Sequence, residues 1–153
     1  MESSIPWGRA VLTALLAAGT ALWGWYGWLI IVWVCAMALD YITGSLAAAK
    51  RRTWSSAKAR QGLYHKLGSI VAVLVSVLLD VLIRVLLRGT QITLPVEVRV
   101  VVSPLVIGWY TLTELGSVLE NAVRLGARVP GWLTRILKIT ADAVDQAGDG
   151  ITK

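Results

Sequence analysis

Several residue types that build soluble enzymes are scarce in this chain. It has one cysteine, Cys35, so no intramolecular disulfide can form. The single histidine, His65, has no neighbouring metal ligands in the sequence, and no CxxC, HExxH, Walker or GxGxxG pattern occurs. These absences argue against zinc, redox and nucleotide sites, so no metal and no cofactor are expected.

Charge is also scarce, at 16% of residues against about 25% in ordinary soluble domains. Hydrophobic residues make up 56%, phenylalanine is absent, and eight tryptophans are present with a net charge of +6. This composition favours a membrane protein with basic cytoplasmic loops and interfacial aromatic residues. Nucleic-acid binding is the other usual interpretation of a basic chain. Here the basic residues lie beside apolar spans, so the expected partner is the lipid bilayer and no nucleic acid.

The first apolar run is too long for one membrane span. Thirty uncharged residues extend from 10 to 39, whereas a span needs about 20. The segment 23–28 contains two glycines among aromatic residues, and glycine permits a tight reversal. We therefore predict a helical hairpin with spans at 6–23 and 28–49 and a turn at 24–27. One long tilted helix is the alternative.

Residues 50–66 change character, because they are rich in basic residues and contain no acid. The basic side chains are Lys50, Arg51, Arg52, Lys58, Arg60 and Lys66. By the positive-inside rule this segment is a cytoplasmic loop and acts as a topology signal. Affinity for anionic lipid headgroups is a second role for the same residues. Ser55 and Ser56 form a plausible N-cap pair for the helix that follows.

Two further spans are predicted at 67–87 and 98–119, and each carries a polar stripe. In the first span the stripe comprises Ser69, Ser76, Asp80 and Arg84, with Asp80 and Arg84 spaced to pair along the helix. In the second span Pro104 is expected to kink the helix. The stripe of that span comprises Tyr110, Glu114, Ser117 and Asn121.

The expected fold is an all-α membrane protein with about four transmembrane helices in residues 1–123. An even number of spans places both termini in the cytoplasm, in agreement with the basic residues after 123. In residues 124–153, apolar residues repeat at helical spacing from Trp132 to Val144. This pattern predicts a C-terminal amphipathic cytoplasmic helix that lies on the membrane or packs on the protein's own cytoplasmic face.

Three spans each carry an acid: Asp40, Asp80 and Glu114. An ionised group near the centre of a membrane helix costs about 2.5–3.5 kcal/mol on insertion scales, so these acids need partners. The small residues Ala36, Gly44 and Ala48 share a face with Asp40, which predicts a close helix contact there. Its partner could be Arg84, Lys66 or Tyr110, or Lys50 or Arg51 from the nearby loop. The acids are then either staples within one bundle or groups exchanged between subunits, and no nucleophile–base pair accompanies them.

These motifs together resemble the toxin-secretion/phage-lysis holin family, over about residues 30–138. The resemblance lies in Asp40-Tyr41-Ile42-Thr43-Gly44, in Leu79-Asp80, and in the segment from Glu114 to Asn121, with Ser55-Ser56, Gly62, Lys66, Gly126 and Pro130 between and after them. The Trp-rich first hairpin and the acidic glycine-containing tail depart from the family pattern. The resemblance implies a non-enzymatic protein that accumulates in the host cytoplasmic membrane and self-associates. It then forms lesions that pass an endolysin without contacting it directly. Some relatives are associated with the export of large toxins.

The residues expected to serve helix packing and oligomerisation are Ala36, Asp40, Thr43, Gly44, Ala48, Asp80, Arg84, Tyr110, Glu114, Ser117, Glu120 and Asn121. Two other functions remain open from the sequence. A small ion or solute channel, or a transporter subunit, would use the acids as permeation or proton-relay groups. An accessory protein that scaffolds a larger membrane complex would not permeabilise membranes alone.

Overall fold

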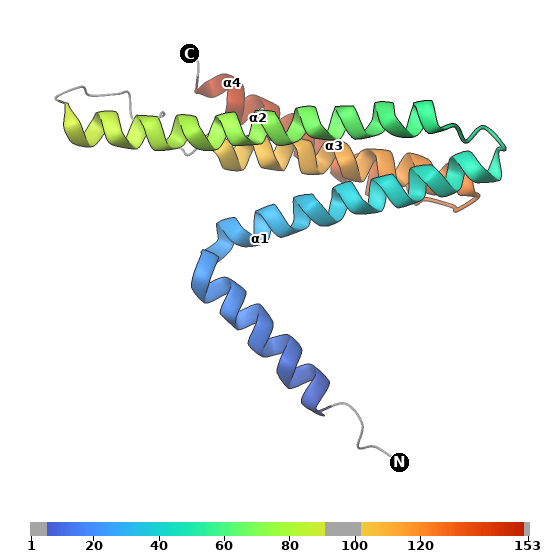
Figure 1. Cartoon of the computed structure of the whole chain (residues 1–153), viewed down its shortest axis with the longest axis horizontal. Coiled ribbons are helices and arrows are strands. Elements are labelled where there is room, and N and C mark those ends of the chain that lie inside the picture. The colour runs from blue at the N-terminus through green and yellow to red at the C-terminus, as the bar shows by residue number, and fades with distance from the viewer. Residues whose placement is uncertain (1–5, 91–101, 152–153) are drawn as a thin grey trace.

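The computed structural model describes residues 6–90 and 102–151, and within them the chain forms four helices (Figure 1). They are α1 (Pro6–Lys50), α2 (Ser56–Gly89), α3 (Val102–Leu125) and α4 (Gly131–Gly150). The all-helical expectation is confirmed. Residues 98–101, at the start of the predicted fourth span, lie outside the described part, and α3 continues six residues beyond the predicted end at 119.

A sharp bend divides α1 at Gly24, where φ is +59° and ψ is −158°. Only glycine adopts this backbone region readily. The segment before the bend projects away from the other helices, while the segment after it runs along them (Figure 1). The predicted turn over 24–27 is therefore wrong in extent, because helix resumes directly after Gly24. The bend falls at one of the two glycines of the predicted turn, but the two segments diverge and do not form the predicted hairpin (Figure 1).

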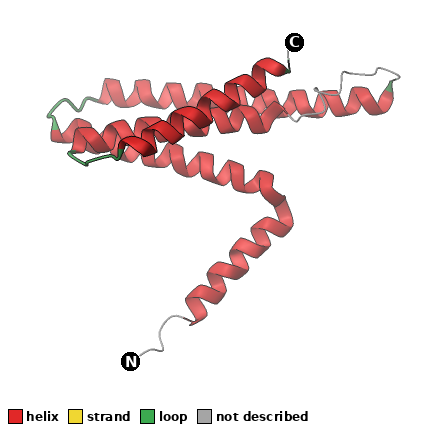
Figure 2. Ribbon diagram, turned by 180° about the vertical axis from the view of Figure 1, so that it is seen from behind, coloured by secondary structure: helices red, strands yellow, loops and turns green. Residues whose placement is uncertain are grey.

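The central element of the bundle is α3, which packs against α1, α2 and α4, whereas α1 and α2 barely touch each other. The second segment of α1 and α3 run in one direction, while α2 and α4 run in the other (Figures 1 and 2). Trp33, Val73 and Ile107, one from each of the first three helices, form the apolar core. The indole nitrogen of Trp33 is buried and has no partner within the described residues.

The first connection is shorter than the predicted loop over 50–66. The last turn of α1 closes with Thr53 N–H donating to the Ala48 carbonyl, and Arg52 takes the left-handed conformation there. Because α2 begins at Ser56, Arg60 and Lys66 are on this helix and not in a loop. The expected N-cap position is occupied by Ser55, whose carbonyl accepts from Ala59 N–H.

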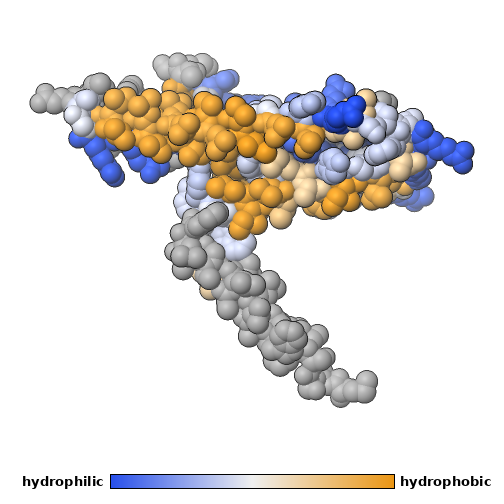
Figure 3. All heavy atoms as spheres, in the orientation of Figure 1, coloured by the Kyte–Doolittle hydropathy of each residue, from blue (hydrophilic) through white to orange (hydrophobic). Residues whose placement is uncertain are grey.

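Much of the outer surface of the bundle is apolar, and its interior holds polar side chains beside the apolar core. Exposed leucine, valine and isoleucine residues cover α2 from Ile70 to Leu86, and Figure 3 shows them as a continuous band with hydrophilic residues at both ends. Among the described residues, five of the seven buried polar side chains are serine, threonine or asparagine, and the other two are Asp80 and Glu114. This arrangement suits a hydrocarbon surrounding, where exposed polar groups are costly.

In the part of the chain that the structure describes, two helical segments are long and apolar enough to cross a membrane: 24–50 and 59–89. At 1.5 Å per residue the second is about 46 Å long, so it extends beyond a hydrocarbon core of about 30 Å. The structure thus supports two of the four predicted spans by length and composition. Pro104 lies in the first turn of α3, where its missing N–H is harmless, so the predicted kink is wrong.

The last helix, α4, starts after Pro130 and folds back obliquely along α3 (Figure 2). Leu133, Leu137, Ala141 and Val144 are half-buried on the side that faces α3. Leu137 lies against Gly116, where a Cβ atom would be 3.6 Å from Leu137 Cδ2. Of the two placements predicted from sequence, the structure has α4 packed on the protein itself.

Candidate functional site: a buried polar seam

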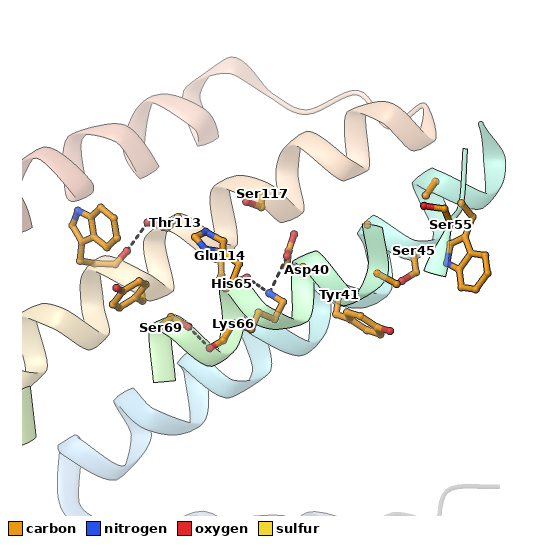
Figure 4. Close-up of a pocket in the computed structure, with 17 residues that line it drawn as sticks. Asp40, Tyr41, Ser45, Ser55, His65, Lys66, Ser69, Thr113, Glu114 and Ser117 are labelled. Carbon is orange, nitrogen blue, oxygen red and sulfur yellow. Dashed lines mark hydrogen bonds and ion pairs between the residues drawn. The ribbon is translucent and has the colours of Figure 1, made fainter. Parts of the chain in front are cut away.

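The centre of the site is Lys66, whose ammonium group lies between two carboxylates from different helices. Its Nζ is 2.9 Å from Asp40 Oδ2 on α1 and 2.5 Å from Glu114 Oε2 on α3 (Figure 4). The three side chains are 12–20% exposed. Two acids and one base give this triad a formal charge of −1. Desolvation offsets much of the attraction in ion pairs this sheltered, but losing one partner is costly because it leaves an uncompensated charge.

The triad continues towards the end of α3 through hydrogen bonds. Asn121 Nδ2 donates to Asp40 Oδ1 at 3.0 Å and lies 3.4 Å from Thr43 Oγ1. Arg124 donates to Asn121 Oδ1 at 2.9 Å and pairs with Glu120 at 3.3 Å on the exposed surface. The position of Asn121 beside Asp40 favours a small residue at Gly44, where a Cβ atom would be 3.3 Å from Asn121 Nδ2.

A cavity of about 370 Å³ opens beside the triad, among α1, α2 and α3. Lys66 and the two acids line it, together with Tyr41, Gly44, Ser45, Ala48, Trp54, His65, Ser69, Trp109, Tyr110, Thr113 and Ser117 (Figure 4). The second oxygen of Glu114, Oε1, has no protein partner within the described residues. The cavity therefore has a polar wall at the end of the bundle where the triad lies.

A second polar cluster lies at the opposite end of α2 and α3. The Asp80 carboxylate accepts from Val102 N–H at 2.7 Å, from Ser103 N–H at 2.9 Å and from Ser103 Oγ at 2.5 Å. The Tyr26 hydroxyl lies 2.8 Å from Ser103 Oγ and ties α1 to the same point. Asp80 thus caps the start of α3, where free backbone N–H groups attract an anion.

The structure distributes the predicted site residues unevenly. Asp40, Thr43, Gly44, Glu114 and Asn121 meet in one network, and Ala36 is buried near it. Arg84 is exposed, and within the described residues it forms no ion pair with Asp80, so that predicted pair is wrong.

The basic residues assigned to the topology signal also differ in where their side chains lie. Arg51, Arg52 and Arg60 are exposed, and the side chain of Lys58 lies outside the described part. Lys50 donates to the Leu125 carbonyl at 2.5 Å, at the end of α3, and does not reach Asp40. Lys66 points into the bundle, so a place for its side chain among lipid headgroups is wrong.

The sequence named Lys66 as one possible partner of Asp40, and the structure confirms this contact. Its position between Asp40 and Glu114 was not predicted, although the sequence carries a signal for it. Lys66, Ser69, Val73, Ser76 and Asp80 follow at steps of three, four, three and four, and all face inward. Extending the predicted stripe by one step back, in place of one step on to Arg84, would have included it. Tyr26 and Ser103 carry no comparable signal, because their contact joins residues 77 apart.

The polar site runs from the Lys66 triad to the Asp80 cluster. It contains carboxylates, amides and hydroxyls whose hydrogen-bond donors are held in place by the helices. Within the described residues no group of three or more His, Cys, Asp or Glu side chains could hold a metal ion. The polar groups link the helices of the chain to each other.

Sequence comparison identifies several proteins to which this chain is similar. The chain is 31% identical over 118 residues to the uncharacterized protein Lmo0128 of Listeria monocytogenes, covering 77% of this chain and 75% of that protein. The uncharacterized protein Lin0175 of Listeria innocua matches with the same identity and coverage. The uncharacterized protein BH0965 of Halalkalibacterium halodurans is 27% identical over 139 residues, covering 91% of this chain and 95% of that protein. No solved structure matches.

A sequence profile of the bacteriophage holin family matches residues 17–142. This segment includes the Asp40 element, the Lys66 triad, the Asp80 cap and most of α4. It covers well over half of the chain, so the resemblance noted from the motifs is confirmed. The chain belongs to the bacteriophage holin family and is a holin-like membrane protein.

Proposed function

We propose that this protein is a phage holin that oligomerises in the host cytoplasmic membrane and permeabilises it, so that an endolysin reaches the cell wall. It acts without enzymatic activity and needs no contact with the endolysin. Two features support this function: membership in the family and the apolar exterior of the bundle.

The observation that carries the proposal is the inverted polarity of the bundle. Its polar groups face inward between helices, and its exterior is suited to lipid. The Lys66 triad joins three helices through side chains alone, so the same pairs can form between helices of different copies. A closed monomer and an assembled ring could then satisfy the same charges, and accumulation in the membrane would shift the balance towards assembly.

In this proposal the basic residues define the inner side of the membrane. Lys50, Arg51, Arg52, Arg124 and Arg128 gather where α1, α2, α3 and α4 connect. The positive-inside rule puts this end in the cytoplasm. Four membrane crossings, with the segment before Gly24 as the first, would then place both termini in the cytoplasm.

The direct test is induction in a bacterium with a potential-sensitive dye present. We expect growth to continue, then abrupt depolarisation, with lysis only if an endolysin is co-expressed. Sustained growth with full membrane potential, at a high level of protein in the membrane, would contradict the proposal.

A second candidate function, a small ion channel or transporter subunit, is favoured by the cavity beside Glu114. Ionisable groups at such a place often serve ion or proton passage. This function predicts saturable flux of small ions and no escape of folded proteins.

A further inference from the structure

The surface of α4 that does not contact α3 carries an exposed apolar stripe, which has no partner among residues 6–90 and 102–151. Trp132 is 62% exposed, Ile136 54% and Ile139 61%, and Ala143 continues the stripe in the next turn. These residues follow at steps of four, three and four, which is the spacing of a coiled-coil seam. The half-buried residues that face α3 lie beside this stripe and are not part of it. One face of α4 thus packs within the chain, and a second remains available.

The charges of α4 decide between the occupants of this face. Two basic residues, Arg135 and Lys138, come first in the helix, and three acids, Asp142, Asp145 and Asp149, come after them. The helix therefore has a net charge of −1, so it has no net attraction for an anionic lipid surface. Its basic half and its acidic half instead complement each other when a second copy runs in the opposite direction.

We propose that α4 pairs antiparallel with α4 of a second copy of this chain, through the Trp132–Ala143 stripe. Arg135 and Asp142 are seven residues apart on one flank of the stripe. In an antiparallel pair this flank meets the same flank of the other copy, so each Arg135 faces an Asp142. In a parallel pair it meets the other flank, which holds Thr140 and Ala147 and offers no charge. Flanking charges of this kind set orientation in coiled coils.

The pair is short, with four seam residues per helix, so it is weak in isolation. Confinement of many copies to one membrane raises their effective concentration and allows a weak contact to form. The inference deepens the self-association in the proposed function, because it names the surface and the direction of pairing. It leaves the Lys66 triad free for its own contacts.

Disulfide cross-linking in membranes of the full chain tests the pairing, with Cys35→Ser as background. Trp132→Cys and Ala143→Cys are made in two differently tagged copies. The antiparallel seam brings residue 132 of one copy opposite residue 143 of the other. Like residues lie about 16 Å apart along the helix, from 11 residues at 1.5 Å each. We expect cross-links only when the two variants are mixed. Thr134→Cys, on the opposite side of α4, is the matched control and should not cross-link.

Exchanging the charges of Arg135 and Asp142 provides a second test of the pairing. Arg135→Asp and Asp142→Arg should each lower the cross-linked fraction roughly three- to tenfold, because both ion pairs become repulsive. The double variant Arg135→Asp/Asp142→Arg, and a mixture of the two single variants, should recover it. If α4 instead docks on lipid, cross-links are absent and vesicle binding follows net charge, so Asp142→Arg binds more tightly. That result overturns the pairing, as do cross-links within each cysteine variant alone.

Cross-linking is read without lysis, so the two proposals fail separately. Depolarisation without cross-links would remove the α4 pair and leave the holin function standing. Cross-links without depolarisation would contradict the holin function and leave the α4 pair standing.

Discussion

Lys66→Met is the substitution to which the bundle should be most sensitive. It leaves Asp40 and Glu114 without their shared cation, and their oxygens lie within 2.9 Å and 2.5 Å of the lost nitrogen. The two carboxylates are then about 5 Å apart and repel by roughly 3 kcal/mol at an effective dielectric constant of 20. The loss of the ion pairs adds to this repulsion. Breaking a buried pair costs about 3–5 kcal/mol, and the partial exposure of the triad argues for the lower end.

The charge count predicts a ranking among variants of the triad. Lys66→Met changes its formal charge from −1 to −2, whereas Asp40→Asn or Glu114→Gln makes it neutral. Each neutral variant keeps one full ion pair, so we expect a loss of only about 1–2 kcal/mol. The double variant Lys66→Met/Glu114→Gln should be more stable than Lys66→Met alone, because the repulsion is gone.

The assay is thermal unfolding in detergent micelles, followed by circular dichroism. A loss of about 3 kcal/mol corresponds to a fall in Tm of roughly 6–12 °C for a chain of this size. Arg60→Gln removes an exposed charge from the same helix and should leave Tm unchanged within about 1–2 °C. Equal Tm values for Lys66→Met and Arg60→Gln would refute the account of the triad.

Three further predictions follow from the same structure. Asp80→Ala leaves the start of α3 uncapped and should lower the free energy of unfolding by about 2–3 kcal/mol. Arg84→Gln should change it by less than about 0.5 kcal/mol, because Arg84 is exposed. Denaturant titration measures both variants. Gly24→Ala strains the bend by about 1–3 kcal/mol, and the distance between spin labels on the two segments of α1 should shift. Asp40→Ala and Glu114→Ala should both alter the time of lysis in the same direction; unchanged timing at equal membrane levels would mean that these acids serve folding alone.

Sequence reasoning located the helices well because hydrophobicity along this chain is strongly patterned. The bend at Gly24 follows from residue type, since glycine alone adopts that conformation readily. The close packing at Gly44 also follows from residue type, since a Cβ atom there would lie 3.3 Å from Asn121 Nδ2. The limits of α2 were harder to predict. Lysine and arginine are good helix formers as well as loop residues, so a basic segment alone does not separate the two.

Partner choice was the least predictable feature. Asp80 had a suitable cation four residues away in Arg84, yet it bonds to backbone N–H groups 22 and 23 residues away. Inward-facing positions on α2 alternate steps of three and four, and the last step, to Asp80, is four. The next inward position is therefore three residues after Asp80, and Arg84 lies outside. Local spacing shows which partners are possible, whereas the packing of α3 against α2 decides which one is buried. The two conflicting roles of Lys66, topology signal or partner of Asp40, were separable only in three dimensions.

The most direct measurement of the central claim uses purified protein in vesicles loaded with a small dye and a folded protein of endolysin size. We expect both to escape together once the protein density passes a threshold. The Cys35→Ser variant should behave as the parent chain, because Cys35 is an exposed free cysteine. Release of the dye with complete retention of the folded protein, at every density, would contradict the account.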